Sequence, residues 1–258
     1  MQSSSRRMHI LELLDQRESV EVMDLSRRFA VSPMTIRRDL ALFERQGLVT
    51  LVYGGAVVNR GATFEPEYAL RTTRHNDQKR VIGVIAASLI DDGDVVFLDA
   101  GTTTLEIALA LRGRANLTVV TPDLAITNLL CREPKMHLIM VGGSFREVSM
   151  AFMGPLAERF MGMLQADKAF LGVDGIDLEV GFTVPDLRDA SLKMVVTSRT
   201  PHVYIVGDTS KFGKRYLATF ATFQQVEGLV MGIDRSDEYV KNLEAAGLRV
   251  VCRAERAA

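Results

Sequence analysis

The chain has 258 residues, of which 47% are hydrophobic, so it can bury a substantial core and is not globally disordered. Its net charge of −1 by itself favours no class of partner. The charge is unevenly spread, because residues 1–60 carry nine arginines and seven carboxylates whereas the remainder has a net charge of −3. The sign of this asymmetry fits a nucleic-acid-binding head on a nearly neutral body.

The sequence carries no signal for secretion, membrane insertion or metal binding. Cys131 and Cys252 have neither metal-ligand spacing nor a disulfide framework. Glu12 and Asp15 interrupt the first apolar run, which argues against a signal peptide, and no apolar stretch is long enough to span a membrane. We therefore expect a cytoplasmic protein that associates with no membrane and holds no metal or cofactor.

The first part of the chain predicts three helices. Apolar side chains recur at helical spacing over about residues 6–16 and 22–29. Ser32 suits the N-cap of a third helix and Pro33 its first position, because proline lacks the N–H that would stay unpaired there. This third helix is expected to end before Gly47.

A β-hairpin is expected to follow the three helices. Apolar residues alternate loosely on either side of Gly54-Gly55, a pattern typical of two strands joined by a tight turn. Three helices and a hairpin within residues 1–58 are the plan of a winged helix-turn-helix, so we assign DNA binding to this segment.

The third helix has two unlike faces. On a helical wheel Ile36, Leu40 and Phe43 form a buried stripe, and three arginines lie outside it. A solvated charged face is the alternative for an isolated helix, but two helices at helix-turn-helix spacing favour contact with DNA. Asp39 is expected to be structural and available to an arginine. The residues expected to contact DNA are Ser32, Met34, Thr35, Arg37, Arg38 and Arg45.

The rest of the chain predicts a linker and an α/β domain. Residues 59–77 are polar and irregular and are expected to form the linker. Over 78–258, apolar β-rich runs alternate with helical stretches, which indicates a mostly parallel sheet covered by helices on both faces. Strands are expected at 95–99, 117–121, 137–142, 168–175, 202–208, 227–234 and 248–252, and helices at 79–90, 104–112, 123–131, 154–164, 187–199 and 235–246.

The stretch FLDAGTTT is the chemical centre of this domain. It places Asp99 at the end of a strand, followed by Gly101, Thr102, Thr103 and Thr104 at the start of a helix. Backbone N–H groups and the helix dipole favour an anion there, glycine permits close approach, and threonine hydroxyls add donors. The alternative is that the threonines only cap the helix.

Other polar residues follow the ends of predicted strands. Asp174 and Asp208 can accept hydrogen bonds from sugar hydroxyls, and Lys211 and Lys193 suit a phosphate. Each could instead be a charge at a strand end or helix surface. Asp189, near Lys193, is expected to be a surface charge.

Several ordered motifs carry a resemblance to a known family. They are LSRRFAVSPMTIRRDLALFERQGLV with GGA, GDVVFLDAGTTTLEIALAL, VVTPDL, VGG, MGPLAE, DKAFLGVDGI and DTSKFG. Over nearly the whole chain the sequence resembles the DeoR family of bacterial transcriptional regulators. The resemblance implies a second domain similar in fold to ribose-5-phosphate isomerase, a sugar-phosphate effector and repression of transcription.

The sequence departs from the family pattern at two places. Leu51 and Tyr53 stand where the family's wing usually has an arginine and a histidine before Gly-Gly-Ala. Thr121 is followed by Pro122 and Asp123, where the family often has Thr-Asn. These departures bear on the wing's contact with DNA and on one effector contact.

Two functions are compatible with these patterns. The first is a non-enzymatic regulator, a repressor of a sugar or polyol catabolic operon that binds operator DNA as a dimer or tetramer and responds to a phosphorylated sugar. The alternative is a sugar-phosphate isomerase or transferase with an appended DNA-binding head. No carboxylate pair with an evident acid/base division of labour is found, and similarity of fold does not imply activity.

Overall fold

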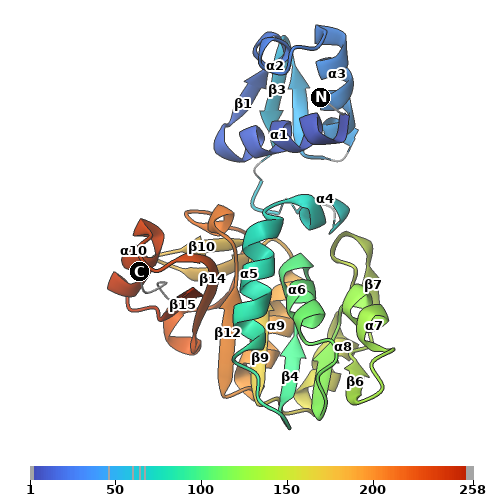
Figure 1. Ribbon diagram of the computed structural model, residues 1–258, viewed down its shortest axis with the longest axis vertical. Helices are drawn as coiled ribbons and strands as arrows, with labels where there is room; N and C mark the ends of the chain where they lie inside the picture. The colour runs from blue at the N-terminus through green and yellow to red at the C-terminus, as the bar shows by residue number, and fades with distance from the viewer. Residues whose placement is uncertain (1–2, 46, 60, 64, 67, 254–258) are drawn as a thin grey trace. The chain divides into compact units, whose positions relative to one another are not determined.

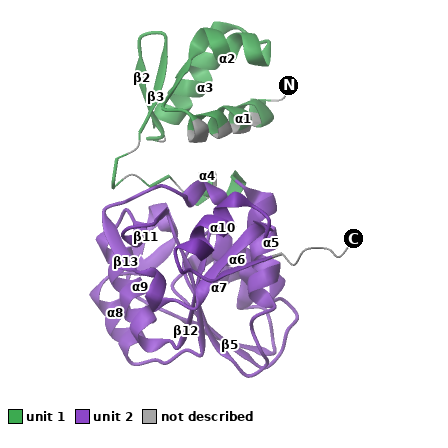
Figure 2. Ribbon diagram, turned by 90° about the vertical axis from the view of Figure 1, so that its left-hand side faces the viewer, with its two compact units in different colours: residues 1–74 green, residues 75–258 purple. Residues whose placement is uncertain are grey.

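The computed structural model describes residues 3–45, 47–59, 61–63, 65–66 and 68–253. The chain forms two compact units, Met1–Arg74 and His75–Ala258, coloured separately in Figure 2. Each unit has its own hydrophobic core, and the second unit has one core on either face of its main sheet.

The first unit is a winged helix-turn-helix, as predicted. Its three-stranded antiparallel sheet has the order β1-β3-β2 and packs against three helices through a core that includes Ile10, Ile36 and Phe43. The elements of the winged helix-turn-helix are α1 (Ser3–Gln16), β1 (Ser19–Glu21), α2 (Val22–Phe29), α3 (Pro33–Arg45), β2 (Val49–Val52) and β3 (Gly55–Val58). Strand β1 has only three residues, too few for alternation to be recognisable in the sequence.

The segment between the predicted domains is more regular than expected. Residues 59–77 were predicted to be irregular, but α4 (Tyr68–Thr73) and the start of α5 (Asn76–Ala87) lie within them. An ion pair of 3.0 Å between Arg71 and Glu65 fastens α4 to the preceding chain. A six-residue helix is too short to display helical periodicity, and for this reason the sequence did not predict it.

The second unit is built on a parallel sheet of seven strands in the order β15-β14-β12-β9-β4-β5-β6 (Figure 1). All seven expected strands are present. They are β4 (Val95–Leu98), β5 (Leu117–Thr121), β6 (Met136–Met140), β9 (Lys168–Gly172), β12 (His202–Val206), β14 (Gly228–Asp234) and β15 (Val250–Arg253).

Helices cover both faces of this sheet, which explains why its strands are almost continuously apolar. One face carries α5, α6 (Thr102–Ala110) and α7 (Leu124–Leu130), and Figure 1 shows α5 beside α6. The other face carries α8 (Pro155–Gly162), α9 (Leu187–Arg199) and α10 (Glu238–Ala245). The sequence predicted the parallel sheet with both faces covered.

Two small antiparallel sheets were not predicted. One has the order β10-β11-β13 and the other pairs β7 with β8. The predicted strand 168–175 is divided, because β9 ends at Gly172 and the N–H of Asp174 donates to the carbonyl of Thr183 in the second sheet. Their strands are β7 (Ser144–Arg146), β8 (Ala151–Met153), β10 (Gly175–Asp177), β11 (Gly181–Val184) and β13 (Ala218–Ala221), and the 3-10 helices are η1 (Glu147–Ser149), η2 (Thr209–Lys211) and η3 (Phe223–Gln225).

Candidate functional site

Helix α3 presents the surface predicted to contact DNA. Ile36 and Leu40 are fully buried, whereas Arg37, Arg38 and Arg45 are exposed. Ser32 and Met34 are also exposed, and Thr35 is half-buried. The oxygen of the Ser32 side chain accepts a hydrogen bond from the Thr35 N–H at 3.2 Å, so Ser32 caps the helix as the sequence predicted.

Asp39 fixes α3 to the first helix. It is 1% exposed, and its two carboxylate oxygens accept hydrogen bonds from Arg6 at 2.7 Å and Arg7 at 2.6 Å. A buried carboxylate needs such partners, because an unpaired buried charge is strongly destabilising. The expectation that Asp39 is structural and pairs with arginine is confirmed.

The wing is a short hairpin with an apolar tip. Tyr53 has a fully exposed side chain, and Leu51 and Val52 are also exposed. The wing is held firmly: Glu44 of α3 accepts a hydrogen bond from the Leu51 N–H, and the carbonyl of Gly54 accepts one from the N–H of Val22. The wing therefore projects apolar side chains from a fixed base.

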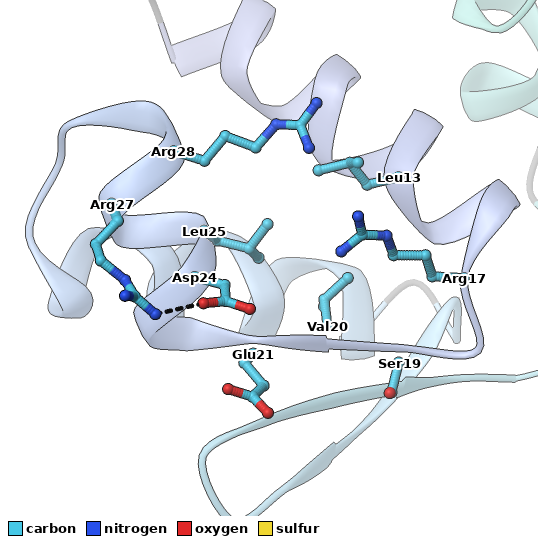
Figure 3. Close-up of a pocket in the computed structure, with 9 residues that line it drawn as sticks. All are labelled: Leu13, Arg17, Ser19, Val20, Glu21, Asp24, Leu25, Arg27 and Arg28. Carbon is cyan, nitrogen blue, oxygen red and sulfur yellow. Dashed lines mark hydrogen bonds and ion pairs between the residues drawn. The ribbon is translucent and has the colours of Figure 1, made fainter.

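A groove of about 660 Å³ also lies in the first unit, between α1, β1 and α2 (Figure 3). Its lining mixes charged and apolar side chains, and the ion pair of Arg27 with Asp24 lies along it. None of the residues predicted to contact DNA or effector lines this groove. The groove is therefore separate from both candidate sites.

In the second unit, four aspartates gather at one edge of the main sheet. Asp208, Asp174, Asp99 and Asp123 follow within two residues the ends of β12, β9, β4 and β5, which are successive neighbours. Because these strands are parallel, their carboxyl ends lie at the same edge. The strand order changes direction between β9 and β4, and such a switch point is where open α/β sheets bind ligands.

The glycine-threonine segment starts helix α6 at this switch point. Gly101 precedes the helix with φ 154°, Thr102 and Thr104 are buried, and Thr103 is half-buried. The Thr104 hydroxyl donates to the carbonyl of Gly101 at 2.9 Å, so this threonine acts within the turn. The first N–H groups of any α-helix lack an acceptor inside the helix, and they give the first turn of α6 the character of an anion site.

Asp123 is a further buried carboxylate beside this segment. In the sequence it was noted only as part of a departure from the family pattern and was not among the expected site residues. Its two carboxylate oxygens accept hydrogen bonds from the N–H groups of Gly101 at 3.0 Å and Ile126 at 2.9 Å. Burial raises the pKa of Asp123 to about 6, although these backbone hydrogen bonds oppose the rise. Its position directly after a strand and before a helix was the available signal.

Lys193 and Asp99 form a buried ion pair beneath the switch point. The Lys193 ammonium is hydrogen-bonded to Asp99 and lies 3.2 Å from Asp189. Asp99 also accepts a hydrogen bond from the Gly172 N–H at 2.9 Å, which joins the ends of β4 and β9. Burial opposes the charged amine, but Asp189, Asp99 and more weakly Asp174 hold the pKa of Lys193 above its ordinary value.

This arrangement changes the expected role of two residues. Asp189 is not a surface charge as predicted, because its side chain is only 17% exposed and pairs with Lys193 four residues later on α9. Lys193 is only 3% exposed and is held by two carboxylates. Lys193 thus neutralises carboxylates under the site.

Asp208 and Lys211 lie in the segment after β12. Asp208 is 1% exposed and accepts a hydrogen bond from the Ser210 N–H at 2.9 Å. Burial alone would raise the pKa of Asp208, but Lys211 and Ser210 hold it below its ordinary value. The Lys211 ammonium also lies 3.7 Å from Asp174, so it stands between two of the four aspartates.

Comparison with known proteins gives the family. A model of the DeoR C-terminal sensor domain matches residues 74–232, and a model of the DeoR-like helix-turn-helix domain matches residues 6–61. The chain belongs to the DeoR family of transcriptional regulators. The resemblance inferred from the motifs is therefore confirmed.

Relatives of this DeoR-family protein are named as regulators. The HTH-type transcriptional regulator GlpR of Haloferax volcanii is 32% identical over 97% of this chain and 98% of its own. The glycerol-3-phosphate regulon repressor of Escherichia coli K12 is 29% identical over 89% and 90%. The protein is accordingly a transcriptional regulator rather than an enzyme.

Among solved structures, ribose 5-phosphate isomerase A of Methanocaldococcus jannaschii matches 53% of this chain and 54% of its own, with 16% identity and a TM-score of 0.39.

In the part of the chain that the structure describes, no helix is long and apolar enough to cross a membrane. The same residues include no cluster of three histidine, cysteine or acidic side chains placed to hold a metal ion.

Proposed function

We propose that this DeoR-family regulator is a cytoplasmic repressor of a sugar or polyol catabolic operon and that a phosphorylated sugar or polyol releases it from DNA. In this proposal residues 1–58 bind the operator, 59–77 connect the units, and 78–258 sense the effector and form a homo-oligomer. The four aspartates at the switch point, with a helix N-terminus among them, are the observation that carries the proposal.

The proposed effector site combines an anion position with acceptors for hydroxyl groups. The phosphate would lie at the first turn of α6, where Thr102, Thr103 and Thr104 contribute N–H and hydroxyl groups. Because the Gly101 N–H already donates to Asp123, glycine's expected part is to give the phosphate room. Carboxylates nearby would repel an anion that lacked hydroxyl groups, which favours a sugar phosphate over inorganic phosphate.

The remaining residues complete the charge balance of this proposed site. Asp174 is half-buried and would accept hydrogen bonds from the hydroxyl groups of the effector, and Lys211 would meet its negative charge. Asp99 and Asp208 are both buried, and we infer that they orient the segments around the effector. Lys193 would have no direct contact with the effector and would instead hold Asp99 in position.

The names of relatives support the class of effector. One relative is named for a glycerol-3-phosphate regulon, which agrees with a phosphorylated polyol or sugar as the signal. Such a compound exists only after uptake and phosphorylation, so it reports that the substrate of the pathway has entered the cell. For release from DNA, the effector must bind one state of the regulator more tightly than the other.

The test replaces Thr103 with tryptophan. Thr103→Trp should fill the phosphate position and abolish release from operator DNA by a panel of phosphorylated sugars and polyols, measured by fluorescence anisotropy. DNA affinity without effector should remain, because α3 is untouched. The control is Thr219→Trp, an exposed threonine of β13 outside the proposed site. A Thr103→Trp protein that responds at wild-type concentrations would contradict the proposal.

A further inference from the structure

The first turn of α5 is hydrogen-bonded to the segment that follows β12. The Gln78 side chain donates from Nε2 to the Thr209 hydroxyl at 3.1 Å, and its Oε1 accepts from the Thr209 N–H at 3.1 Å. These residues are 131 positions apart and partly buried. Thr209 begins η2, the short helix that carries Lys211, so Gln78 holds one wall of the proposed effector site.

Charges link the same turn to the same segment. Lys79 is 4% exposed, and Asp208 is 1% exposed. His75 and Lys79 act electrostatically on the Asp208 carboxylate in the same direction as Lys211 does. The negative charge of Asp208 is therefore stabilised from two sides, by Lys211 within its own segment and by the first turn of α5.

The backbone leaves this turn little freedom. His75 has a left-handed conformation with φ 52°, which a residue with a side chain adopts at a conformational cost and keeps only where its surroundings hold it. On the opposite side, a Cβ atom at Gly232 of β14 would lie 2.4 Å from the carbonyl oxygen of Gln78. The turn is thus packed closely between β14 and the segment that carries Thr209.

This turn lies at the boundary between the two units along the chain. His75 is the first residue of the second unit, and Arg74 is the last residue of the first. Hydrogen bonds and charge therefore connect the segment Asp208–Lys211 to the turn at which the chain passes from the first unit into the second.

We propose that the turn His75–Lys79 is the coupling element through which effector occupancy and DNA binding influence each other. This inference rests on the proposed function. An anionic effector that draws Lys211 towards itself leaves Asp208 more dependent on His75 and Lys79, and the Gln78–Thr209 hydrogen bonds carry the resulting shift into α5. Coupling between distant sites is carried by packed side chains and hydrogen-bond networks, and this turn provides both.

Thermodynamic reciprocity allows a test that needs no effector. If the effector site alters DNA affinity through this turn, then DNA binding must alter the effector site through it. The probe is a DNA duplex selected by the wild-type protein from a random-sequence pool, and the readout is hydrogen exchange of the peptide that covers residues 207–213, measured with and without duplex.

In the wild-type protein, the duplex should change the exchange rate of this peptide. In Gln78→Ala, and in Thr209→Val, which lacks the hydroxyl but retains the N–H, the DNA-dependent change should be lost or reduced while the duplex still binds. Val84→Ala, at an exposed position of the same helix, should behave like wild type. Thermal unfolding of each variant verifies that it is folded.

Two results would overturn the inference: no DNA-dependent change in the wild-type protein, or an undiminished change in both variants. Failure of the proposed function looks different. In that case the wild type shows the DNA-dependent change, but no phosphorylated sugar or polyol releases it from the duplex.

Discussion

At the surface of α3, Arg37 and Arg38 lie outside the buried stripe and near the N-terminal half of the helix, the part that reaches base edges in helix-turn-helix proteins. We expect Arg37→Ala and Arg38→Ala each to weaken operator binding, by about 1–3 kcal/mol where the arginine contacts a guanine. Both side chains are exposed, so thermal stability should change little. Anisotropy titrations at several salt concentrations measure the effect.

Ile36→Ala provides the contrast on the same helix. Ile36 is fully buried, and truncating it should destabilise the first unit by roughly 2–5 kcal/mol through lost burial and a cavity. Its effect on DNA binding should follow the loss of folded protein. If both arginine variants bound like wild type across the salt series, α3 would not be the recognition helix.

Asp123 predicts a specific dependence of stability on pH. Its pKa is raised to about 6 in the folded protein from an ordinary value of 3.8, so the folded state binds a proton more readily than the unfolded chain. As the pH falls from 7 to 5, this group should therefore increase the free energy of unfolding, by about 1 kcal/mol. This increase in the free energy of unfolding is absent at pH values above the pKa of the folded state. It is complete at pH values below the pKa of the unfolded chain.

The measurement compares wild type with Asp123→Asn by chemical denaturation at pH 7 and pH 5. Asparagine cannot accept both backbone hydrogen bonds that Asp123 accepts, so the variant should be less stable at either pH. The informative quantity is the difference between the proteins, because other titrating groups cancel. A difference that is the same at both pH values would contradict the raised pKa.

How far individual residues could be predicted depended on the range of their contacts. Ser32 caps the helix that it precedes, and this was visible in the sequence because the interaction is local. The pairing of Lys193 with Asp99 joins residues 94 positions apart, and Asp123 meets Gly101 across 22. Such pairs are set by the order of strands in the sheet, which a single sequence does not reveal.

Among the elements, the wing holds one of the two departures from the family pattern, and it offers a test of its approach to DNA. Residues 47–63 contain no carboxylate, and the fully exposed Tyr53 at the tip is uncharged. We expect Tyr53→Arg to tighten DNA binding and to steepen the salt dependence of log K by about 0.9, the value for one added phosphate contact. Tyr53→Gln, which adds no charge, is the control. An unchanged slope for Tyr53→Arg would mean that the wing tip stays away from the phosphates.

Elements were predictable where they were long and apolar. Most strands of the main sheet are largely buried and helices flank most of them, so their apolar runs stand out along the sequence. The strands that were missed, such as β7 and β10, have three residues and pair through backbone hydrogen bonds with distant segments. Helix α4, with six residues, was missed for the same reason of length.

The whole molecule is expected to be an oligomer, because one winged head makes few base contacts and two linked heads gain affinity through effective concentration. Helices α8 and α9 provide the most suitable surface. Leu156 and Met163 on or just after α8, and Leu187 and Met194 on α9, are each seven residues apart and between 55% and 70% exposed. These two helices lie side by side (Figure 2), and so many exposed apolar side chains on a helical layer are typical of a protein interface.

Light scattering at micromolar concentration should therefore show at least a dimer of the wild-type protein. Met194→Glu and Leu156→Glu should shift the protein towards monomer, because an interface cannot accommodate an unpaired buried charge. Both variants should still fold, since the side chains are exposed in the single chain. They should bind a single half-site duplex like wild type and lose affinity for the full operator. A wild-type protein that is monomeric both alone and on DNA would contradict this prediction, and glutamate variants that remain oligomeric would place the interface on another surface.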